Sequence, residues 1–234
     1  GAPQLMKILK LHFLNKKELL VIIIGIILSL VLATKNLEKF DKVENYNSDK
    51  SKHLMLKSDM KHVWQVAEKF RLELSNGKSF FDSLPLYDRA FLQPILVGYF
   101  YHILDKEIFQ KNERGEFVIK TQNFKFGILV IQILIFYIAI YFFFIEFSKQ
   151  FSNKKNKYNS IIILAFLSIE PSILQWQSSF WSESLFLSLM IILFTFLIRP
   201  SQSNFLKFFI GILIGLMYSQ KAYSFFYIFP VLIF

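Results

Sequence analysis

The chain has 234 residues, of which 54% are hydrophobic and 18% aromatic, and its formal net charge is +10. This composition, with a mean hydropathy of +0.41, lies outside that of ordinary soluble domains and indicates an integral membrane protein. The positive charge does not indicate nucleic-acid binding, because the basic residues flank hydrophobic runs instead of gathering on one soluble face. The sequence contains no cysteine, which excludes disulfide and thiolate chemistry in this chain.

The N-terminal residues 1–17 are predicted to form a cytoplasmic tail. Within it, 1–5 are expected to be a non-native remnant, because Met6 resembles a natural start. The first hydrophobic run, 18–34, lacks a small-residue cleavage site and is predicted to be a retained signal anchor. At the other end the chain stops at Phe234 inside an apolar run, so we expect the sequence to be a fragment of a longer protein.

A polar stretch at 35–125 separates the first two hydrophobic runs, and loops of this length commonly carry function. Apolar residues recur at helical spacing after Asp59 and stop at Gly77. This pattern predicts an amphipathic interfacial helix at about 59–75, with Asp59 at its N-terminus. A second interfacial helix is predicted at about 92–105.

All but one of the hydrophobic runs are shorter than a bilayer crossing requires. About 20 apolar residues are needed for a helix to cross a bilayer, and only Phe126–Ile145 is long enough alone. The other runs must include flanking residues or be shortened by partner helices. The sequence predicts five complete spans and the start of a sixth, at 18–34, 126–147, 159–175, 183–198, 207–220 and 222–234, joined by cytoplasmic loops at 148–158 and 199–206 and an extracytoplasmic turn at 176–182.

The orientation follows from the short loops. If the N-terminus is cytoplasmic, the short cytoplasmic segments hold ten basic residues and the opposite short loops hold one, Lys221. This is the bias expected from the positive-inside rule. It places the loop 35–125 and both Glu170 and Glu183 on the extracytoplasmic side with Lys221. The predicted fold class is therefore an all-α polytopic membrane bundle with a long first extracytoplasmic loop.

The ionisable residues on that face have simple structural interpretations. Asp59 is suited to capping a helix, because its oxygens accept orphan N–H groups and its charge suits the helix dipole. Arg89 fits a surface ion pair, but its guanidinium also matches a phosphate. Lys221 is able to extend to the interface or to hold a lipid phosphate. Glu183 either caps a helix or serves a site, because carboxylates at this depth are costly unless paired, solvated or used.

The tryptophans and the histidines of this chain do not by themselves indicate a site. Trp176 and Trp181 suit an interfacial belt, with sugar stacking as the other interpretation. No nucleotide-binding or nucleophile-elbow motif is present. The histidines also lack metal-ligand spacing; they are His12, His53, His62 and His102.

After Asp59, the predicted helix carries Trp64, Ala67 and Phe70 and closes at Gly77. This arrangement resembles the opening extracytoplasmic helix of the GT-C fold membrane glycosyltransferases. The similarity is to the bacterial relatives of the protein O-mannosyltransferases and of the lipid A aminoarabinose transferase.

Four later features share the resemblance. Arg89 stands where the family has an Arg-Pro-Pro-type turn, although the adjoining prolines are missing here. Pro171 and then Glu183 at the opening of a span follow the family order. The segment Gly211–Leu216 before Lys221 resembles the later Gly-x-x-x-Gly-Leu span, where many relatives end in Arg. Together these features cover the N-terminal half of a typical member.

The resemblance implies an inverting glycosyltransferase of the bacterial inner membrane. It would transfer a sugar from a polyprenyl-phosphate donor to a glycan, lipid or protein acceptor at the extracytoplasmic face. Asp59 would be the general base, Arg89 and Lys221 would hold the lipid phosphate, and Glu183 would orient hydroxyl groups. No metal, cofactor or nucleic acid is expected to take part. The candidate pocket-lining residues are Trp64, Tyr87, Asp88, Trp176 and Trp181.

Three alternatives remain open at this point. A glycan polymerase or ligase is disfavoured because its long loop would come late in the chain. A transporter or flippase for lipid-linked glycans would place charged groups at the midplane of broken helices. The third alternative is a non-catalytic membrane protein that binds glycolipids. The sugar, the acceptor and the oligomeric state are not encoded in any motif of this chain.

Overall fold

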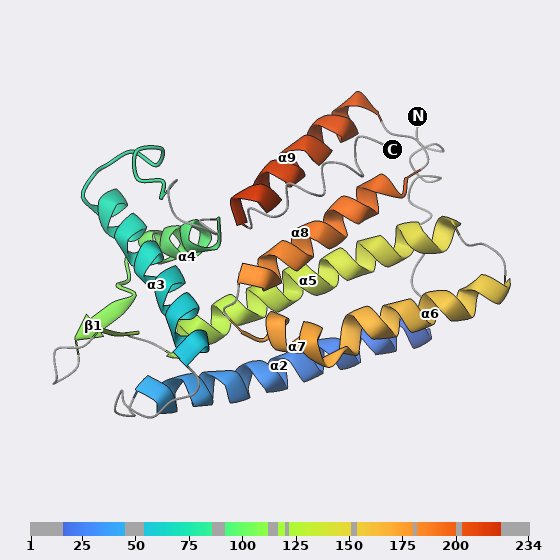
Figure 1. Ribbon diagram of the computed structural model, residues 1–234, viewed down its shortest axis with the longest axis horizontal. Coiled ribbons are helices and arrows are strands. Elements are labelled where there is room, and N and C mark those ends of the chain that lie inside the picture. Colours follow the sequence, from blue (N-terminus) through green and yellow to red (C-terminus); the bar gives the residue numbers. More distant parts are fainter. Residues whose placement is uncertain are drawn as a thin grey trace.

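The computed structural model describes residues 16–44, 54–85, 92–111, 117–119, 122–150, 154–179, 182–199 and 203–220. Within these ranges the chain is mainly helical (Figure 1). The helices are α2 (Lys16–Glu44), α3 (Leu54–Ser75), α4 (Leu92–Ile103), α5 (Gln122–Gln150), α6 (Lys154–Ile169), α7 (Pro171–Gln177), α8 (Ser182–Leu197) and α9 (Asn204–Gln220).

Two of the described helices are long and apolar enough to cross a membrane. The apolar part of α2 runs over Lys16–Leu37 and that of α5 over Phe126–Lys149, which are 22 and 24 residues. Both exceed the roughly 20 residues that a bilayer requires. Shorter apolar helices follow at α8 and α9. Length and composition therefore support membrane association of this chain.

The long helices form a bundle. Figure 1 shows α2, α5, α6, α8 and α9 alongside one another, with consecutive members running in opposite directions. The central helix is α5, which packs against α2, α6 and α8. Its buried face repeats every three or four residues, as expected for a helix packed along one stripe. This stripe consists of Leu129, Ile133, Phe136, Ile140 and Phe144.

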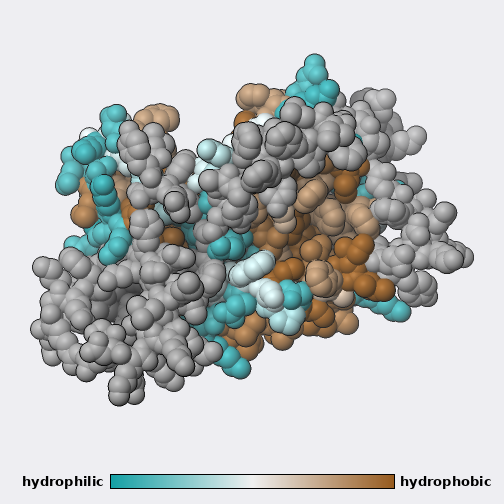
Figure 2. Space-filling model, in the orientation of Figure 1, coloured by the Kyte–Doolittle hydropathy of each residue, from teal (hydrophilic) through white to brown (hydrophobic). Residues whose placement is uncertain are grey.

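The outward face of the bundle is also apolar. On α2, the side chains of Ile23, Ile27 and Val31 are about half exposed, and Ile138 and Phe142 are exposed on α5. Figure 2 shows hydrophobic residues gathered over the middle of the bundle and hydrophilic residues toward the end that carries α3. An exposed apolar surface of this extent marks a region that contacts lipid or another apolar partner.

The α3 and α4 helices cover the end of the bundle where α2 ends and α5 begins (Figure 1). They pack closely, because a Cβ atom on Gly98 would lie 2.5 Å from the backbone oxygen of Ala67. Glycine is thus required at this crossing. Trp64 is 1% exposed and meets Tyr101 edge to face, with ring centroids 6.2 Å apart. The α3–α4 pair is therefore tightly packed, and its buried residues are continuous with the core of the bundle.

An ion pair within α3 includes Glu68, which also contacts the chain that follows α4. Arg71 donates to both carboxylate oxygens of Glu68, at 2.7 and 2.9 Å. The hydrogen bond to Glu68 raises the pKa of Arg71 above its ordinary value. Glu68 also accepts the backbone N–H of Ile108 at 3.3 Å. These contacts position the segment that leads into the first strand.

The predicted helical class is confirmed, and the described residues add one short hairpin to it. Strands β1 (Phe109–Lys111) and β2 (Phe117–Ile119) pair antiparallel, with Gln110 opposite Val118. The strands contain Phe, Val and Ile, residues that favour a pleated, half-buried surface. No strand was predicted within the polar stretch 35–125, because charged residues surround these short apolar segments.

The predicted start of the first interfacial helix is wrong. The helix α3 begins at Leu54, so Asp59 lies in its second turn instead of at the N-terminus. Leu54, Met55 and Leu56 are good helix formers and extend the helix backwards. The capping interpretation of Asp59, and the helix-dipole argument that accompanied it, no longer apply.

The predicted span 159–175 is not one continuous helix. It breaks at Glu170, between the end of α6 and the start of α7. Pro171 occupies the first position of α7, where its missing N–H costs nothing. Glu170 caps α7, and its carboxylate accepts the backbone N–H of Ile173 at 2.8 Å. The predicted turn at 176–182 begins later than expected, because α7 continues to Gln177.

Candidate functional site: an apolar groove with a buried amide cluster

A groove with a volume of about 240 Å³ lies between α4, α5 and α8. Its described lining contains no ionisable side chain. Leu96 and Ile131 are about half exposed and border the groove, so it opens onto the outer apolar surface. The lining residues are Gln93, Leu96, Val97 and Phe100 from α4, Ile128, Ile131, Gln132 and Ile135 from α5, and Leu185 and Ser188 from α8.

The polar residues of this lining are Ser188 and two glutamines. Gln132 lies on α5 and is 8% exposed; its Nε2 donates to the backbone oxygens of Gln177 and Ser179, at 3.0 and 2.9 Å. These carbonyls belong to the end of α7, where the last turn leaves acceptors without partners inside the helix. The two bonds identify the Gln132 amide nitrogen, so Oε1 is its acceptor.

Gln93 lies at the start of α4, opposite Gln132, and is 5% exposed. Its Nε2 donates to Gln132 Oε1 at 3.4 Å. Its own Oε1 is buried and has no hydrogen-bond partner among the described residues. A buried acceptor without a partner is costly and uncommon in folded proteins. Gln93, a residue of the groove lining, therefore carries one enclosed acceptor that its described protein surroundings do not satisfy.

The amides belong to a larger arrangement, here called the glutamine cluster, whose members are Gln93, Gln132, Gln177 and Ser184. Ser184 Oγ donates to Gln177 Oε1 at 2.8 Å, which links α8 to α7. Asn36 on α2 donates to the backbone oxygen of Ser178 at 3.0 Å. Hydrogen bonds of this kind hold helices together where apolar packing alone does not distinguish neighbours.

The last helix reaches the same cluster. The backbone N–H of Gln93 donates to Gln220 Oε1 at 3.2 Å, across 127 residues of sequence. This N–H is one of the orphan donors at the start of α4. Gln220 is the last residue of α9 and is fully buried. The start of α4 and the end of α9 are thereby fixed beside each other.

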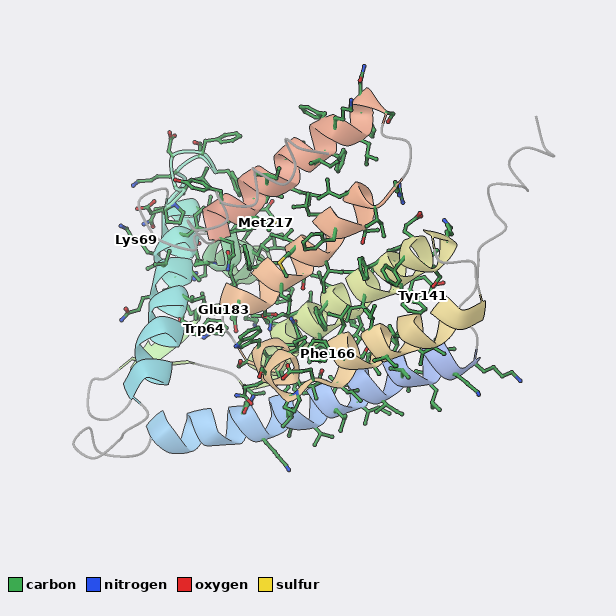
Figure 3. The ribbon with its side chains drawn as sticks, turned by 45° about the vertical axis from the view of Figure 1, so that its right-hand side comes forward. Trp64, Lys69, Tyr141, Phe166, Glu183 and Met217 are labelled. Atoms are coloured by element: carbon green, nitrogen blue, oxygen red, sulfur yellow. The ribbon has the colours of Figure 1, made fainter. Side chains whose placement is uncertain are left out.

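The structure describes three of the predicted site residues with their side chains. Figure 3 shows Trp64 on α3 and Glu183 in the first turn of α8, both at the end of the bundle that α3 and α4 cover. Trp64 belongs to the main hydrophobic core, where it packs against Tyr101, and it does not line the groove. Glu183 is partly buried and directly precedes Ser184 of the glutamine cluster. Trp176 is 36% exposed on α7 and lies outside the groove lining.

The structure does not describe the side chains of the other predicted site residues. Asp59 lies within α3, where the structure describes its backbone but not its side chain. The remainder lie outside the described residues, and they are Tyr87, Asp88, Arg89, Trp181 and Lys221. In the described part of the chain, no group of three His, Asp or Glu side chains is arranged to hold a metal ion.

Sequence reasoning missed the glutamine cluster because it followed charged residues. A signal was present, since Gln132 interrupts the otherwise apolar run Phe126–Ile145. Polar side chains in such runs are expensive, so they usually have a partner or a function. The hydrogen-bond partners of Gln132, however, lie 39 to 47 residues away along the chain, so the sequence around it does not reveal them.

The fold and the groove define a mainly helical protein with two candidate membrane-crossing helices and an apolar groove bordered by buried amides. No protein-family model matches this sequence. Neither a curated protein nor a solved structure matches the chain.

Proposed function

We propose that this chain is the N-terminal part of a polytopic membrane glycosyltransferase that resembles the GT-C fold enzymes. It would take a sugar from a polyprenyl-phosphate donor and transfer it, with inversion, to an acceptor at the extracytoplasmic face. The observation that carries the proposal is the hydrogen bond between Gln93 and Gln220, because it joins the two segments that lead to the proposed phosphate-binding residues.

Both cations are close to this bond along the chain. Lys221 directly follows Gln220, and adjacent Cα atoms are about 3.8 Å apart. Arg89 precedes Gln93 by four residues, which span at most roughly 14 Å. Two cations near one lipid phosphate are suited to stabilise the negative charge that develops when the phosphate leaves.

Two acids are attached to the same end of the bundle. Glu183 precedes Ser184, which is hydrogen-bonded to Gln177. Asp59 is eight residues before Ala67, the residue of α3 that contacts Gly98, and this corresponds to about 12 Å of helix. The helix that carries the proposed base therefore packs onto α4, the helix that borders the groove.

The proposed reaction assigns one step to each group. The acceptor hydroxyl attacks the anomeric carbon, the bond between that carbon and the phosphate oxygen breaks, and the lipid phosphate leaves with the electron pair. The carboxylate of Asp59 takes the hydroxyl proton. Arg89 and Lys221 hold the leaving phosphate, and Glu183 orients hydroxyl groups of the sugar or the acceptor.

The decisive variant is Asp59→Asn in the full-length protein, reconstituted in liposomes with a radiolabelled polyprenyl-phosphate sugar. Loss of the general base is expected to lower the transfer rate by about 10²- to 10⁴-fold. The matched control is Asp82→Asn, because Asp82 is an exposed acid of the same loop and its bond to Ser79 needs only an acceptor oxygen. Transfer by Asp59→Asn at the wild-type rate would refute the assignment.

A second variant tests the phosphate-binding role. Lys221→Met is expected to raise the concentration of lipid donor needed for half-maximal transfer, because one cation at the phosphate is lost. Circular dichroism of the purified variant checks that the helical fold is retained. An unchanged donor requirement would remove Lys221 from the site.

One observation favours a different function. The break between α6 and α7 at Glu170 is the kind of discontinuity that forms substrate sites in transporters and flippases. The two functions are separated by measuring sugar transfer and transbilayer movement of the lipid-linked glycan in the same liposomes. Movement without transfer would support the flippase and contradict the glycosyltransferase.

A further inference from the structure

Three ionisable side chains meet where α5 and α8 end, at the end of the bundle farthest from α3 (Figure 1). Glu146 Oε1 accepts a hydrogen bond from Lys149 Nζ on the same helix, at 2.9 Å. The same oxygen accepts from Nη2 of Arg199, which follows α8, at 3.3 Å. Two cations therefore share one carboxylate, and these three residues, here called the basic trio, keep a net charge of +1.

The two cations of the trio remain accessible. The side chain of Lys149 is 45% exposed and that of Arg199 is 37% exposed, whereas that of Glu146 is only 15% exposed. An ammonium group has three N–H donors and a guanidinium has five, and the bonds to Glu146 use one N–H of each. Because both bonds end on one oxygen, the two cations lie close enough together for a single phosphate group to contact both.

An exposed apolar stripe of α5 leads up to the trio. Ile138 and Phe142 precede Lys149 by 11 and 7 residues, which are nearly whole numbers of helical turns, so all three lie on one face. The side chains of Ile138 and Phe142 are about half exposed. From Ile138, at the middle of the apolar segment Phe126–Lys149, the helix rises about 16 Å to Lys149. This length is close to one leaflet, half of the roughly 30 Å hydrocarbon core.

Further positive charge is present at the same end of the bundle, where α2 and α9 begin (Figure 1). Among the side chains that the structure describes at these helix ends, the basic residues outnumber the acidic ones. They are Lys16, Lys17, Lys149, Arg199 and Lys207 against Glu18 and Glu146. Clusters of basic residues beside a membrane-crossing helix attract anionic lipids.

The combination of trio and stripe discriminates between occupants. A phosphate group matches the donors of Lys149 and Arg199, but a free phosphate would make no use of the apolar stripe. A zwitterionic lipid brings its own cation, and the one carboxylate of the trio is mostly covered and already bonded to two cations. A phospholipid with a net negative head group satisfies both the charge of the trio and the apolar face below it.

We propose that the basic trio and the α5 stripe bind an anionic phospholipid of the leaflet at this end of the bundle. The lipid phosphate contacts Lys149 and Arg199, and an acyl chain lies along Phe142 and Ile138. This site lies at the opposite end of α8 from Glu183, so it takes no part in the proposed sugar transfer. Its occupation is measured without any sugar donor.

The test is photolabelling of the full-length protein in phosphatidylcholine nanodiscs. Two probes, a phosphatidylglycerol and a phosphatidylcholine, have identical acyl chains with a diazirine at the same mid-chain carbon. Labelled peptides are mapped by mass spectrometry. Phosphatidylglycerol is expected to label the part of α5 around Ile138 and Phe142 roughly fivefold more than phosphatidylcholine, the ratio that corresponds to one net cation at the membrane surface.

Variants of the trio change this ratio in opposite directions. Lys149→Gln removes the net charge and is expected to bring the ratio to about one. Glu146→Gln keeps an oxygen that accepts from both cations but removes the acid, so the ratio is expected to rise above that of the wild-type protein. A purely structural ion pair would not produce a rise in one variant and a fall in the other.

The matched control is Lys207→Gln, which removes the same charge from an exposed position of α9 at the same end of the bundle. It is expected to leave the ratio nearly unchanged, because Lys207 is not part of the trio. Arg199→Lys keeps the charge and is expected to retain most of the preference. Inorganic phosphate, compared with sodium chloride at equal ionic strength, should not lower the ratio. Circular dichroism checks the helical fold of each variant.

Four outcomes would overturn the proposal. They are equal labelling of the wild-type protein by the two lipids, labels that map away from α5, a loss in Lys207→Gln as large as in Lys149→Gln, and displacement of the lipid by inorganic phosphate. The first two need no variant. Failure of the proposed glycosyltransferase would appear differently, as unaltered sugar transfer by Asp59→Asn with the lipid preference intact.

Discussion

Among the described residues, two buried polar arrangements join helices of this bundle, and they differ in how closely they are packed. One is the glutamine cluster. The other, here called the tyrosine cluster, consists of Ser29, Tyr137 and Ser168. Tyr137 Oη donates to the backbone oxygen of Ser168 at 2.8 Å and lies 3.1 Å from Ser29 Oγ, which is then the donor to Tyr137.

The tyrosine cluster is closed. A Cβ atom on Gly25 would lie 2.5 Å from both the backbone oxygen of Ser168 and Tyr137 Oη, so no space remains there. The glutamine cluster borders a groove of about 240 Å³. An unpartnered oxygen alone does not make the difference, because Ser168 Oγ is also buried without a described partner. The two clusters therefore differ in the space beside their residues and not in the presence of an unpartnered, enclosed oxygen.

The largest effect is expected where the packing is tightest. Gly25→Ala should lower the free energy of unfolding by about 1–3 kcal/mol, because the new methyl group forces the backbone of α6 away from α2. The matched control is Gly127→Ala, at a helical glycine with open space around it, which should raise stability by up to about 1 kcal/mol. Thermal unfolding in one detergent, followed by circular dichroism, measures both. Equal shifts in the same direction would contradict the close approach.

A smaller effect is expected for the tyrosine cluster itself. Tyr137→Phe removes the hydroxyl that joins three helices, and interhelical hydrogen bonds of this kind contribute about 0.6–1.7 kcal/mol. The same thermal measurement should show this loss. An unfolding temperature equal to that of the wild-type protein would contradict this role of the Tyr137 hydroxyl.

The smallest effect on stability is expected for Gln93→Leu. The substitution loses one long hydrogen bond of 3.4 Å and leaves Gln132 Oε1 without it, but it also removes a buried acceptor that has no described partner. The lost hydrogen bond and the removal of the unpaired acceptor should nearly cancel in the free energy of unfolding, to within about 0.5 kcal/mol. A loss comparable to that of Tyr137→Phe would contradict this near cancellation.

The helices of the bundle could be anticipated from the sequence to a large extent. Helix α5 covers the predicted 126–147, and α8 at Ser182–Leu197 nearly coincides with the predicted 183–198. Long apolar runs bounded by charged residues specify such helices locally. The start of α3 at Leu54 was missed, because Ser58 and Asp59 form a plausible cap whether or not the helix continues before them.

The break at Glu170 was only partly anticipated. The order Glu170–Pro171 suggests a helix boundary, since proline disfavours helical geometry in the residue before it. The sequence nevertheless predicts one span through this point, because the apolar residues on both sides suffice for a crossing. The short strands β1 and β2 were missed for a related reason, since three-residue strands leave little pattern to detect.

Composition and periodicity along the chain determined that this protein is helical and apolar, because helix formation and hydrophobic contrast depend on neighbours within a few residues. Only the tertiary structure decided which polar groups meet. Gln93 contacts Gln132 and Gln220 across 39 and 127 residues, and these pairings arise from the way α4 lies across the end of the bundle. Whether a glutamine is satisfied, and whether space adjoins it, depends on that packing and not on the local sequence.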